Sequence, residues 1–268
     1  MTDSSPFCCV QLSGERALKT LHGQSTQDLL SLTSDQAPLT AFLNPKGRML
    51  ATARVFQDRE TVYLITAADT ADLLIEKLKP MCLLARVTIE RSALVAVLTG
   101  PSNTALLPGS IERDKDHWRI GEHGHTEWVV GHQTPSHQVS ADIARLNAGF
   151  AMIHHAASDL LIPQQAHYQM LGGVSFTKGC YTGQEIVARL EHLGQTKKYL
   201  KIAPIERPIV VGEALDIEGQ SLPVMDVGFE KDHGVALVLS PVEFTSEKLL
   251  DPPFEIIRQV AGHRPGKR

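Results

Sequence analysis

The sequence predicts an α+β fold, on the order of its expected elements and on a change of pattern along the chain. Residues 49–98 combine strands with one helix, with strands expected at 49–56, 61–66, 86–90 and 94–98 and a helix at 71–78. This order is typical of an α+β fold rather than of a doubly wound parallel sheet. From residue 198 onward, short apolar runs separated by Gly, Pro or Asp predict a small β-barrel.

The N-terminal elements follow from apolar runs and the residues that interrupt them. A short strand is expected at 7–12, followed by helices at 15–21 and 26–32. Asn44-Pro-Lys-Gly47 is a strong turn signal, and the two strands after it are expected to form a hairpin. The helix at 71–78 is expected to end before Pro80, because proline lacks the amide hydrogen that a helix interior needs.

The later elements are shorter. A helical run is expected at 101–107, and a helix capped by Ser140 at 140–146. Strands are expected at 118–121, 127–130, 199–202, 209–211, 214–217, 223–229, 235–239 and 254–259.

Length and composition exclude several classes of protein. The 268 residues carry a formal net charge of −4, which argues against direct tRNA binding, because nucleic-acid binding through phosphates favours a basic surplus. No apolar stretch approaches the roughly 18 residues needed to cross a membrane. Four cysteines without C-x-x-C spacing indicate reduced thiols in a cytoplasmic protein and argue against a structural metal site.

The segment Lys178-Gly-Cys-Tyr-Thr-Gly-Gln-Glu185 combines a helix start with a cysteine. Thr182 and Glu185 have the spacing of a capping box, which predicts a helix over 183–193. The helix dipole and Lys178 would then favour the thiolate form of Cys180. A lone cysteine is also often a small buried hydrophobe, so the local physics leaves a reactive and a structural thiol equally open.

This segment, continued by Ile-Val-Ala-Arg189, resembles the signature of the YgfZ proteins. These are folate-binding relatives of the glycine cleavage T-protein (aminomethyltransferase) that act in iron–sulfur cluster assembly or repair and are linked in bacteria to tRNA modification. Other motifs agree in order, namely His22-Gly-Gln-Ser-Thr-Gln-Asp28, Asn44-Pro-Lys-Gly-Arg48, Ala148-Gly-Phe150, Ile162-Pro-Gln164 and Gly173-Val-Ser-Phe176.

The resemblance implies a T-protein-like three-domain ring. A folate-binding domain would combine residues 1–48 and 140–193, a ferredoxin-like α+β domain would span 49–139, and a C-terminal β-barrel would span 194–268. It implies tetrahydrofolate as the cofactor. Lys178 and Cys180 are expected to carry the chemistry, with Lys178 lowering the thiol pKa or holding an anion. The expected folate-binding residues are Phe7, Arg48, Gln164, Tyr181, Gln184 and Glu185.

Three functions remain open on the sequence. The first is a tetrahydrofolate-binding accessory protein for iron–sulfur assembly or repair, with iron–sulfur client or assembly proteins as partners, tRNA-modifying enzymes among them. The second is a folate-dependent, aminomethyltransferase-like one-carbon enzyme, although Asn44 and Gln164 stand where a carboxylate would be useful. The third is a binding scaffold in which Cys180 is structural.

Histidines are frequent between residues 117 and 137 and again at His154 and His155. Their spacing matches no metal-ligand motif, so we expect them at the solvent-exposed surface.

Overall fold

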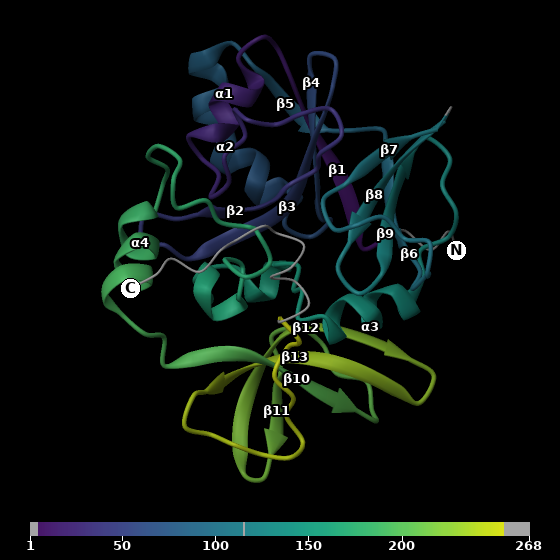
Figure 1. The fold of residues 1–268 in the computed structure, drawn as a ribbon, viewed down its shortest axis with the longest axis vertical. Helices are drawn as coiled ribbons and strands as arrows, with labels where there is room; N and C mark the ends of the chain where they lie inside the picture. The colour runs from purple at the N-terminus through teal and green to yellow at the C-terminus, as the bar shows by residue number, and fades with distance from the viewer. Residues whose placement is uncertain (1–4, 115, 255–268) are drawn as a thin grey trace.

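The computed structural model describes residues 5–114 and 116–254, which form three antiparallel sheets, four α-helices and two short 3-10 helices. Figure 1 shows the three sheets around a central segment that follows helix α3 (Val139–Asn147). That segment contains the 3-10 helices η1 (His155–Ala157) and η2 (Pro163–Ala166) and leads to helix α4 (Gln184–Leu193). The α+β class predicted from the sequence is confirmed.

The first sheet has the strand order β2-β3-β4-β1-β5. Its strands are β1 (Phe7–Ser13), β2 (Leu39–Leu43), β3 (Met49–Asp58), β4 (Thr61–Ala67) and β5 (Thr88–Arg91). The predicted hairpin is β3–β4, in which Val55 pairs with Leu64. One face of the sheet packs against α1 (Ala17–His22) and α2 (Ala71–Ala85), and the other contributes to the central core.

Because β1 lies between β4 and β5, this sheet takes strands from both sides of residue 48. Strand pairing by itself does not divide a chain into independently folding units. The domain boundaries predicted at residues 48, 139 and 193 therefore stay predictions.

Helix α2 extends seven residues beyond the predicted end at residue 78, with Pro80 inside it. The prediction was wrong because the buried face continues through Leu74, Leu78 and Cys82, while Pro80 lies on the exposed side. Burial of this apolar stripe outweighs the backbone hydrogen bond that the proline removes.

Two predicted helices, at 26–32 and 101–107, are irregular segments in the structure. In the first, Thr26 Oγ1 donates to the carbonyl of Gly173 (2.6 Å) and its own carbonyl accepts from Ser175. In the second, Leu106 N donates to the Glu127 carboxylate (2.7 Å). Contacts with distant residues replace the local hydrogen bonds that a helix would have formed.

The other two sheets each have four strands. The second has the order β6-β9-β8-β7, and the third β10-β13-β12-β11. Their bounds are β6 (Val95–Thr99), β7 (Ile111–Arg113), β8 (His117–Glu122), β9 (Thr126–Gly131), β10 (Lys198–Ile205), β11 (Ala214–Ile217), β12 (Gln220–Glu230) and β13 (His233–Pro241).

The predicted β-rich C-terminal part is confirmed as the third sheet, and its closure into a barrel stays a prediction. The strand expected at 209–211 is a turn region, in which the Gly212 amide bonds to the carbonyl of Val224. Of the strand expected at 254–259, all but Phe254 lies outside the described residues.

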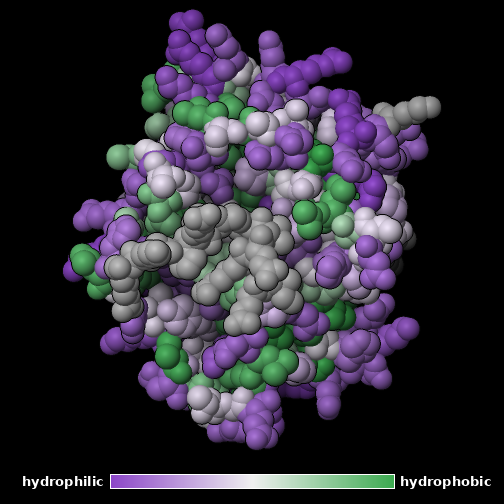
Figure 2. All heavy atoms as spheres, viewed as in Figure 1, coloured by the Kyte–Doolittle hydropathy of each residue, from purple (hydrophilic) through white to green (hydrophobic). Residues whose placement is uncertain are grey.

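Polar side chains cover most of the molecular face in Figure 2, with hydrophobic side chains in small separate groups. None of the helices in the described ranges has both the length and the apolar character required to span a membrane.

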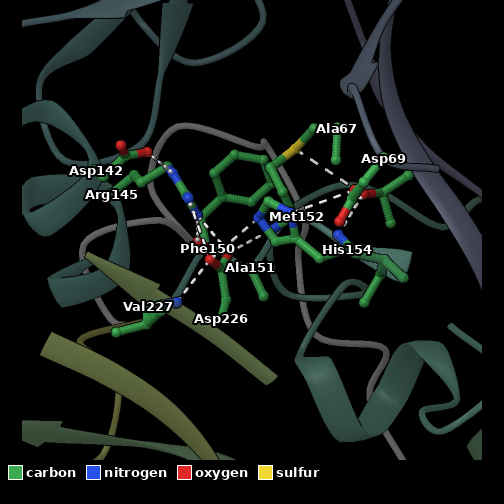
Figure 3. Close-up of polar contacts among 12 residues, drawn as sticks. Ala67, Asp69, Asp142, Arg145, Phe150, Ala151, Met152, His154, Asp226 and Val227 are labelled. Carbon is green, nitrogen blue, oxygen red and sulfur yellow. Dashed lines mark hydrogen bonds and ion pairs between the residues drawn. The ribbon is translucent and has the colours of Figure 1, made fainter. Parts of the chain in front are cut away.

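A buried ion-pair network joins α3 to the third sheet (Figure 3). Arg145 of α3 donates to both carboxylate oxygens of Asp226 on β12 (2.6 and 3.3 Å) and to Asp142 (2.9 Å). Asp226 follows an irregularity in the pairing of β12 with β13 and also accepts from the amide of Met152 (2.8 Å). Burial opposes the charge on Asp226, but Arg145 and His154 hold its pKa well below the usual range.

The predicted helix at 140–146 is α3, but Ser140 does not cap it. Helix α3 begins after Gln138, and the Ser140 hydroxyl donates to the carbonyl of Gly100 (3.1 Å) instead. The neighbouring His137 donates from Nε2 to Asp142 (2.6 Å), because its Nδ1 accepts from the Leu98 amide.

His154 extends the network to the first sheet. Its ring lies between Asp69, which follows β4 (3.4 Å), and Asp226 (3.5 Å). Burial alone would lower the pKa of His154, but the two carboxylates raise it from 6.5 to about 9. His154 and His137 are both largely buried, so their predicted surface positions were wrong.

The raised pKa of His154 predicts a pH-dependent stability. In the His154→Gln variant we expect a loss of about 3 kcal/mol in the free energy of unfolding at pH 6, because the folded state holds the proton more tightly than the unfolded state. The difference from wild type should shrink between pH 6.5 and about 9 and vanish above that range. Urea unfolding at several pH values measures it.

The matched control is His233→Gln, because His233 is exposed beside Asp232 on the third sheet. Its difference from wild type should be small at every pH. If the loss of unfolding free energy in His154→Gln stays constant across this pH range, it would contradict a charged His154 between Asp69 and Asp226.

Candidate functional site

The predicted helix after the signature segment is α4, but it begins without the predicted capping box. Its N-cap is Gly183, whose φ of 82° lies in the left-handed region. The Thr182 hydroxyl donates to the side chain of Gln24 (3.2 Å) rather than serving the helix. A tertiary contact therefore uses the hydroxyl that the local spacing assigned to the cap.

Close backbone packing fixes the start of α4 against the 44–47 turn. A Cβ on Gly183 would lie 2.6 Å from the Asn44 carbonyl oxygen, and one on Gly47 would lie 2.8 Å from Ile186 Cβ. Both glycines also have positive φ, so other residues would be strained at either position.

Lys178 is buried and holds the loop after α1. Its Nζ donates to the carbonyl oxygens of His22, Ser25 and Gln27 at 2.5, 2.7 and 3.0 Å. Burial lowers the pKa of Lys178 to about 8, while Asp28 opposes the shift. Most molecules therefore carry the ammonium at pH 7, and its three N–H groups are all used. None is left to hold an anion, which corrects one of the two roles predicted for Lys178.

The residues after Lys178 differ sharply in exposure. Tyr181 is buried, and its ring centroid lies 5.0 Å from Lys178 Nζ, a cation–π contact. Burial raises the pKa of Tyr181 to about 12. Cys180 is exposed, and a Cβ on the adjacent Gly179 would meet no atom within 4 Å. The segment thus places an accessible thiol between two anchored side chains, and all four cysteines are free.

A cavity of about 650 Å³ lies beside the loop that Lys178 holds. Its lining comes from the first half of the chain, from α3 and from the central segment. Apolar side chains form much of the wall, namely Leu32, Leu39, Leu106, Leu107 and Leu171. Polar side chains interrupt it, namely Gln27, Asp28, Ser31, Gln36, Arg54, Glu122, His123, His125 and Asn147.

Lys178 is connected to this cavity by the loop after α1, which it holds. The carbonyl of Gln27 accepts from Lys178, and the Gln27 side chain donates to the carbonyl of Gly172 (2.5 Å). The Gln27 side-chain oxygen in turn accepts from the amide of Asp28 (2.8 Å). Gln27 and Asp28 are therefore held in the wall by the signature segment, across about 150 residues of sequence.

A second buried cluster also lines the cavity. Arg54 of β3 makes a bidentate contact with Glu122 of β8, which also contacts His123 (2.7 Å) and Trp128 (2.9 Å). Burial opposes the charge on Glu122, but Arg54 holds its pKa well below the usual range. His123 is buried, so its predicted surface position was wrong.

The expected folate-binding residues lie elsewhere. None of the six belongs to the cavity lining of the described residues. Phe7 packs edge-on against Trp128, with ring centroids 4.7 Å apart. Gln164 donates to the carbonyl of Val187 in α4 (2.8 Å), and Arg48 donates to that of Leu160 (2.8 Å). Tyr181 contacts Lys178, while Gln184 and Glu185 open helix α4. Their roles in folate binding stay predictions.

The sequence contained signals for the residues that do line the cavity. Gln27 and Asp28 belong to the motif 22–28 that already resembled the family. Arg54 is a lone charge in an apolar strand and therefore requires a buried partner. No local pattern identifies Glu122 as that partner, because 68 residues separate the two.

The fold and its central cavity define the class of protein. The structure is similar to glycine cleavage system aminomethyltransferase T from Bartonella henselae, with a TM-score of 0.64 over 93% of this chain and 84% of that chain. Sequence identity is 17%, so this likeness shows the fold alone. The chain has a T-protein-like fold.

Sequence relatives identify the family. No protein-family model matches the chain. It is 30% identical over 222 residues to tRNA-modifying protein YgfZ of Yersinia pseudotuberculosis serotype IB (strain PB1/+), covering 72% of this chain and 67% of the relative. It is 29% identical over 237 residues to the same protein of Escherichia coli O157:H7 (strain EC4115 / EHEC), covering 77% and 73%. The chain belongs to the YgfZ family.

The position of Lys178 predicts a specific effect of its removal. In Lys178→Met, three carbonyl oxygens lose a charged donor, and we expect the free energy of unfolding to fall by about 1–3 kcal/mol. The amides of Ser25 and Thr26, which bond to the carbonyls of Leu21 and Ala41, should exchange their hydrogens faster. Hydrogen–deuterium exchange measures this.

Lys46→Met, at an exposed position of the 44–47 turn, is the control and should leave this exchange unchanged. Unchanged exchange at Ser25 and Thr26 in Lys178→Met would contradict the anchoring role.

Proposed function

We propose that this protein acts in the cytoplasm as a tetrahydrofolate-binding accessory protein for assembly or repair of iron–sulfur clusters. The observation that carries the proposal is the 650 Å³ cavity, whose polar wall is held in place by Lys178 of the family signature. The relatives are named for tRNA modification. We assign that link to iron–sulfur client enzymes that modify tRNA rather than to direct tRNA binding by this acidic chain.

The cavity fits the chemistry of a folate. Its volume lies within the range of about 300–1,000 Å³ found for small-molecule sites. The leucine-rich wall suits the flat faces of a pterin and an aminobenzoyl ring. Among the described residues, the side-chain amides of Gln36 and Asn147 have no hydrogen-bond partner within the protein, so both are available for the polar edge of a ligand.

Cys180 supplies the second part of the proposal. Its thiol is exposed on a segment whose neighbours Lys178 and Tyr181 are anchored. Such a thiol is positioned to donate a thiolate to a cluster or partner protein for a short time without disturbing the cavity. In this proposal folate binds in the cavity whose wall Lys178 helps to hold, and the cluster or partner meets the exposed thiol outside the cavity lining.

The alternative is a folate-dependent one-carbon transferase, and the structural relative is named an aminomethyltransferase. One observation favours it, because the Asp28 carboxylate lines the cavity and provides the acidic group that neither Asn44 nor Gln164 provides. Incubation of the purified protein with tetrahydrofolate and a one-carbon donor, with analysis of the folate products, tests this alternative.

Filling the cavity should abolish folate binding. Ala148 directly follows α3 and lines the cavity, so Ala148→Trp places an indole in the volume that the ligand would occupy. We expect at least a tenfold weaker affinity for tetrahydrofolate by calorimetry. Ala214→Trp, at an exposed position in β11, is the control and should bind as wild type does.

Equal affinity of the Ala148→Trp and wild-type proteins would place the folate elsewhere. No binding by wild type would contradict the folate assignment altogether.

Replacing Cys180 should separate the two parts of the proposal. In Cys180→Ala we expect unchanged affinity for tetrahydrofolate, because the thiol is outside the cavity lining. We expect loss of [4Fe–4S] enzyme activity in cells that lack the native protein and express this variant. Cys8→Ala is the matched control and should restore that activity. Full restoration by Cys180→Ala would overturn the role of the thiol.

A further inference from the structure

The ring of His123 is held in one orientation by Glu122. Its Nδ1 lies 2.7 Å from Glu122 Oε1, and the His123 amide donates to the same oxygen (2.9 Å). The carboxylate is ionised, because Arg54 keeps its pKa low against the effect of burial. Arg54 Nη2 also lies 3.4 Å from Nδ1, but the Glu122 contact is much shorter, and because an ionised carboxylate only accepts hydrogen bonds, Nδ1 carries the hydrogen.

Glu122 is fully occupied and has no capacity for a ligand. Besides the two His123 groups, it accepts from Arg54 Nε (2.7 Å), from Arg54 Nη2 and from Trp128 Nε1 (2.9 Å). The Phe150 ring lies 5.5 Å from the imidazole, centroid to centroid, and restricts it further. This arrangement fixes the tautomer and direction of a histidine and resembles the carboxylate–histidine pairs that orient other functional imidazoles.

The second ring nitrogen of His123 is not used by the described residues. Nε2 of His123 has no hydrogen bond to any residue in the described ranges, and it is not among their buried unpaired polar atoms. His123 lines the cavity and is only 3% exposed. With Nδ1 turned to Glu122, Nε2 on the other side of the ring is the atom left for a ligand in the cavity that His123 lines, and in the neutral ring it is a hydrogen-bond acceptor.

We propose that His123 determines which part of the ligand enters this end of the cavity, by accepting a hydrogen bond from a ring N–H of the pterin. The proposal rests on the folate-binding function proposed above. The nearby Glu122 charge disfavours the carboxylates of the folate tail. A pterin presents N–H groups on a flat ring, which matches a fixed acceptor in a leucine-lined wall.

The test compares wild type with His123→Phe, which keeps an aromatic ring beside Phe150 but has no acceptor. The probes are tetrahydrofolate and 6-hydroxymethylpterin, which lacks the glutamate tail. We expect the affinity for both to fall about three- to tenfold, as the loss of one hydrogen bond to a neutral group predicts. His233→Phe, outside the cavity lining, is the control and should bind both probes as wild type does.

A spectroscopic measurement on the wild-type protein gives a second test of the role of His123. With ¹⁵N-labelled histidine, we expect the His123 ring to have its hydrogen on Nδ1 before binding and the Nε2 resonance to shift when either probe binds. His123→Phe with wild-type affinity, or an unshifted Nε2 resonance with bound ligand, would overturn the role of His123 and leave folate binding intact. If wild type binds neither probe, the proposed function fails and this inference fails with it.

Discussion

The structure depends first on the buried pair of Arg145 and Asp226. Both side chains are almost fully excluded from solvent, and 81 residues separate them. Two buried charges are costly to remove from water, and breaking such a pair typically costs about 3–5 kcal/mol. Here the pair is completed by Asp142, by the Met152 amide and by His154. The network therefore fixes α3, the third sheet and the central segment in one arrangement.

The same principle, that a buried charge needs partners, explains the contacts of Lys178 at the site. A buried ammonium requires acceptors, and three backbone carbonyls of a distant loop provide them. The loop then has little freedom, and Gln27 and Asp28 stay in the cavity wall. The signature segment is thus connected to the ligand cavity through a loop rather than by its own contact with a ligand. A residue outside the cavity lining thus holds a loop that forms part of the cavity wall.

The sequence predicted those helices and strands that local patterns determine. The predictions were wrong where contacts with distant residues determine the local structure. The β3–β4 hairpin and helices α2, α3 and α4 follow from apolar periodicity and turn residues. The helix caps predicted at Thr182 and Ser140 do not form, because each hydroxyl donates a hydrogen bond to a distant part of the chain. The cavity was beyond sequence reasoning for a similar reason, since Asp28, Arg54 and His123 meet only in the folded chain.

The two buried carboxylate clusters indicate what kind of site this is. Asp226 and Glu122 are both saturated by donors, so neither is free to take a proton from a substrate. The polar groups that line the cavity are amides, histidines, the Ser31 hydroxyl, the paired Arg54 and Glu122, and the Asp28 carboxylate, on a wall with much apolar surface. Such a lining orients a heterocycle by hydrogen bonding and contains few groups for acid–base chemistry. The exposed thiol of Cys180 lies outside the cavity lining, so the proposed accessory role assigns ligand binding and thiol chemistry to separate places.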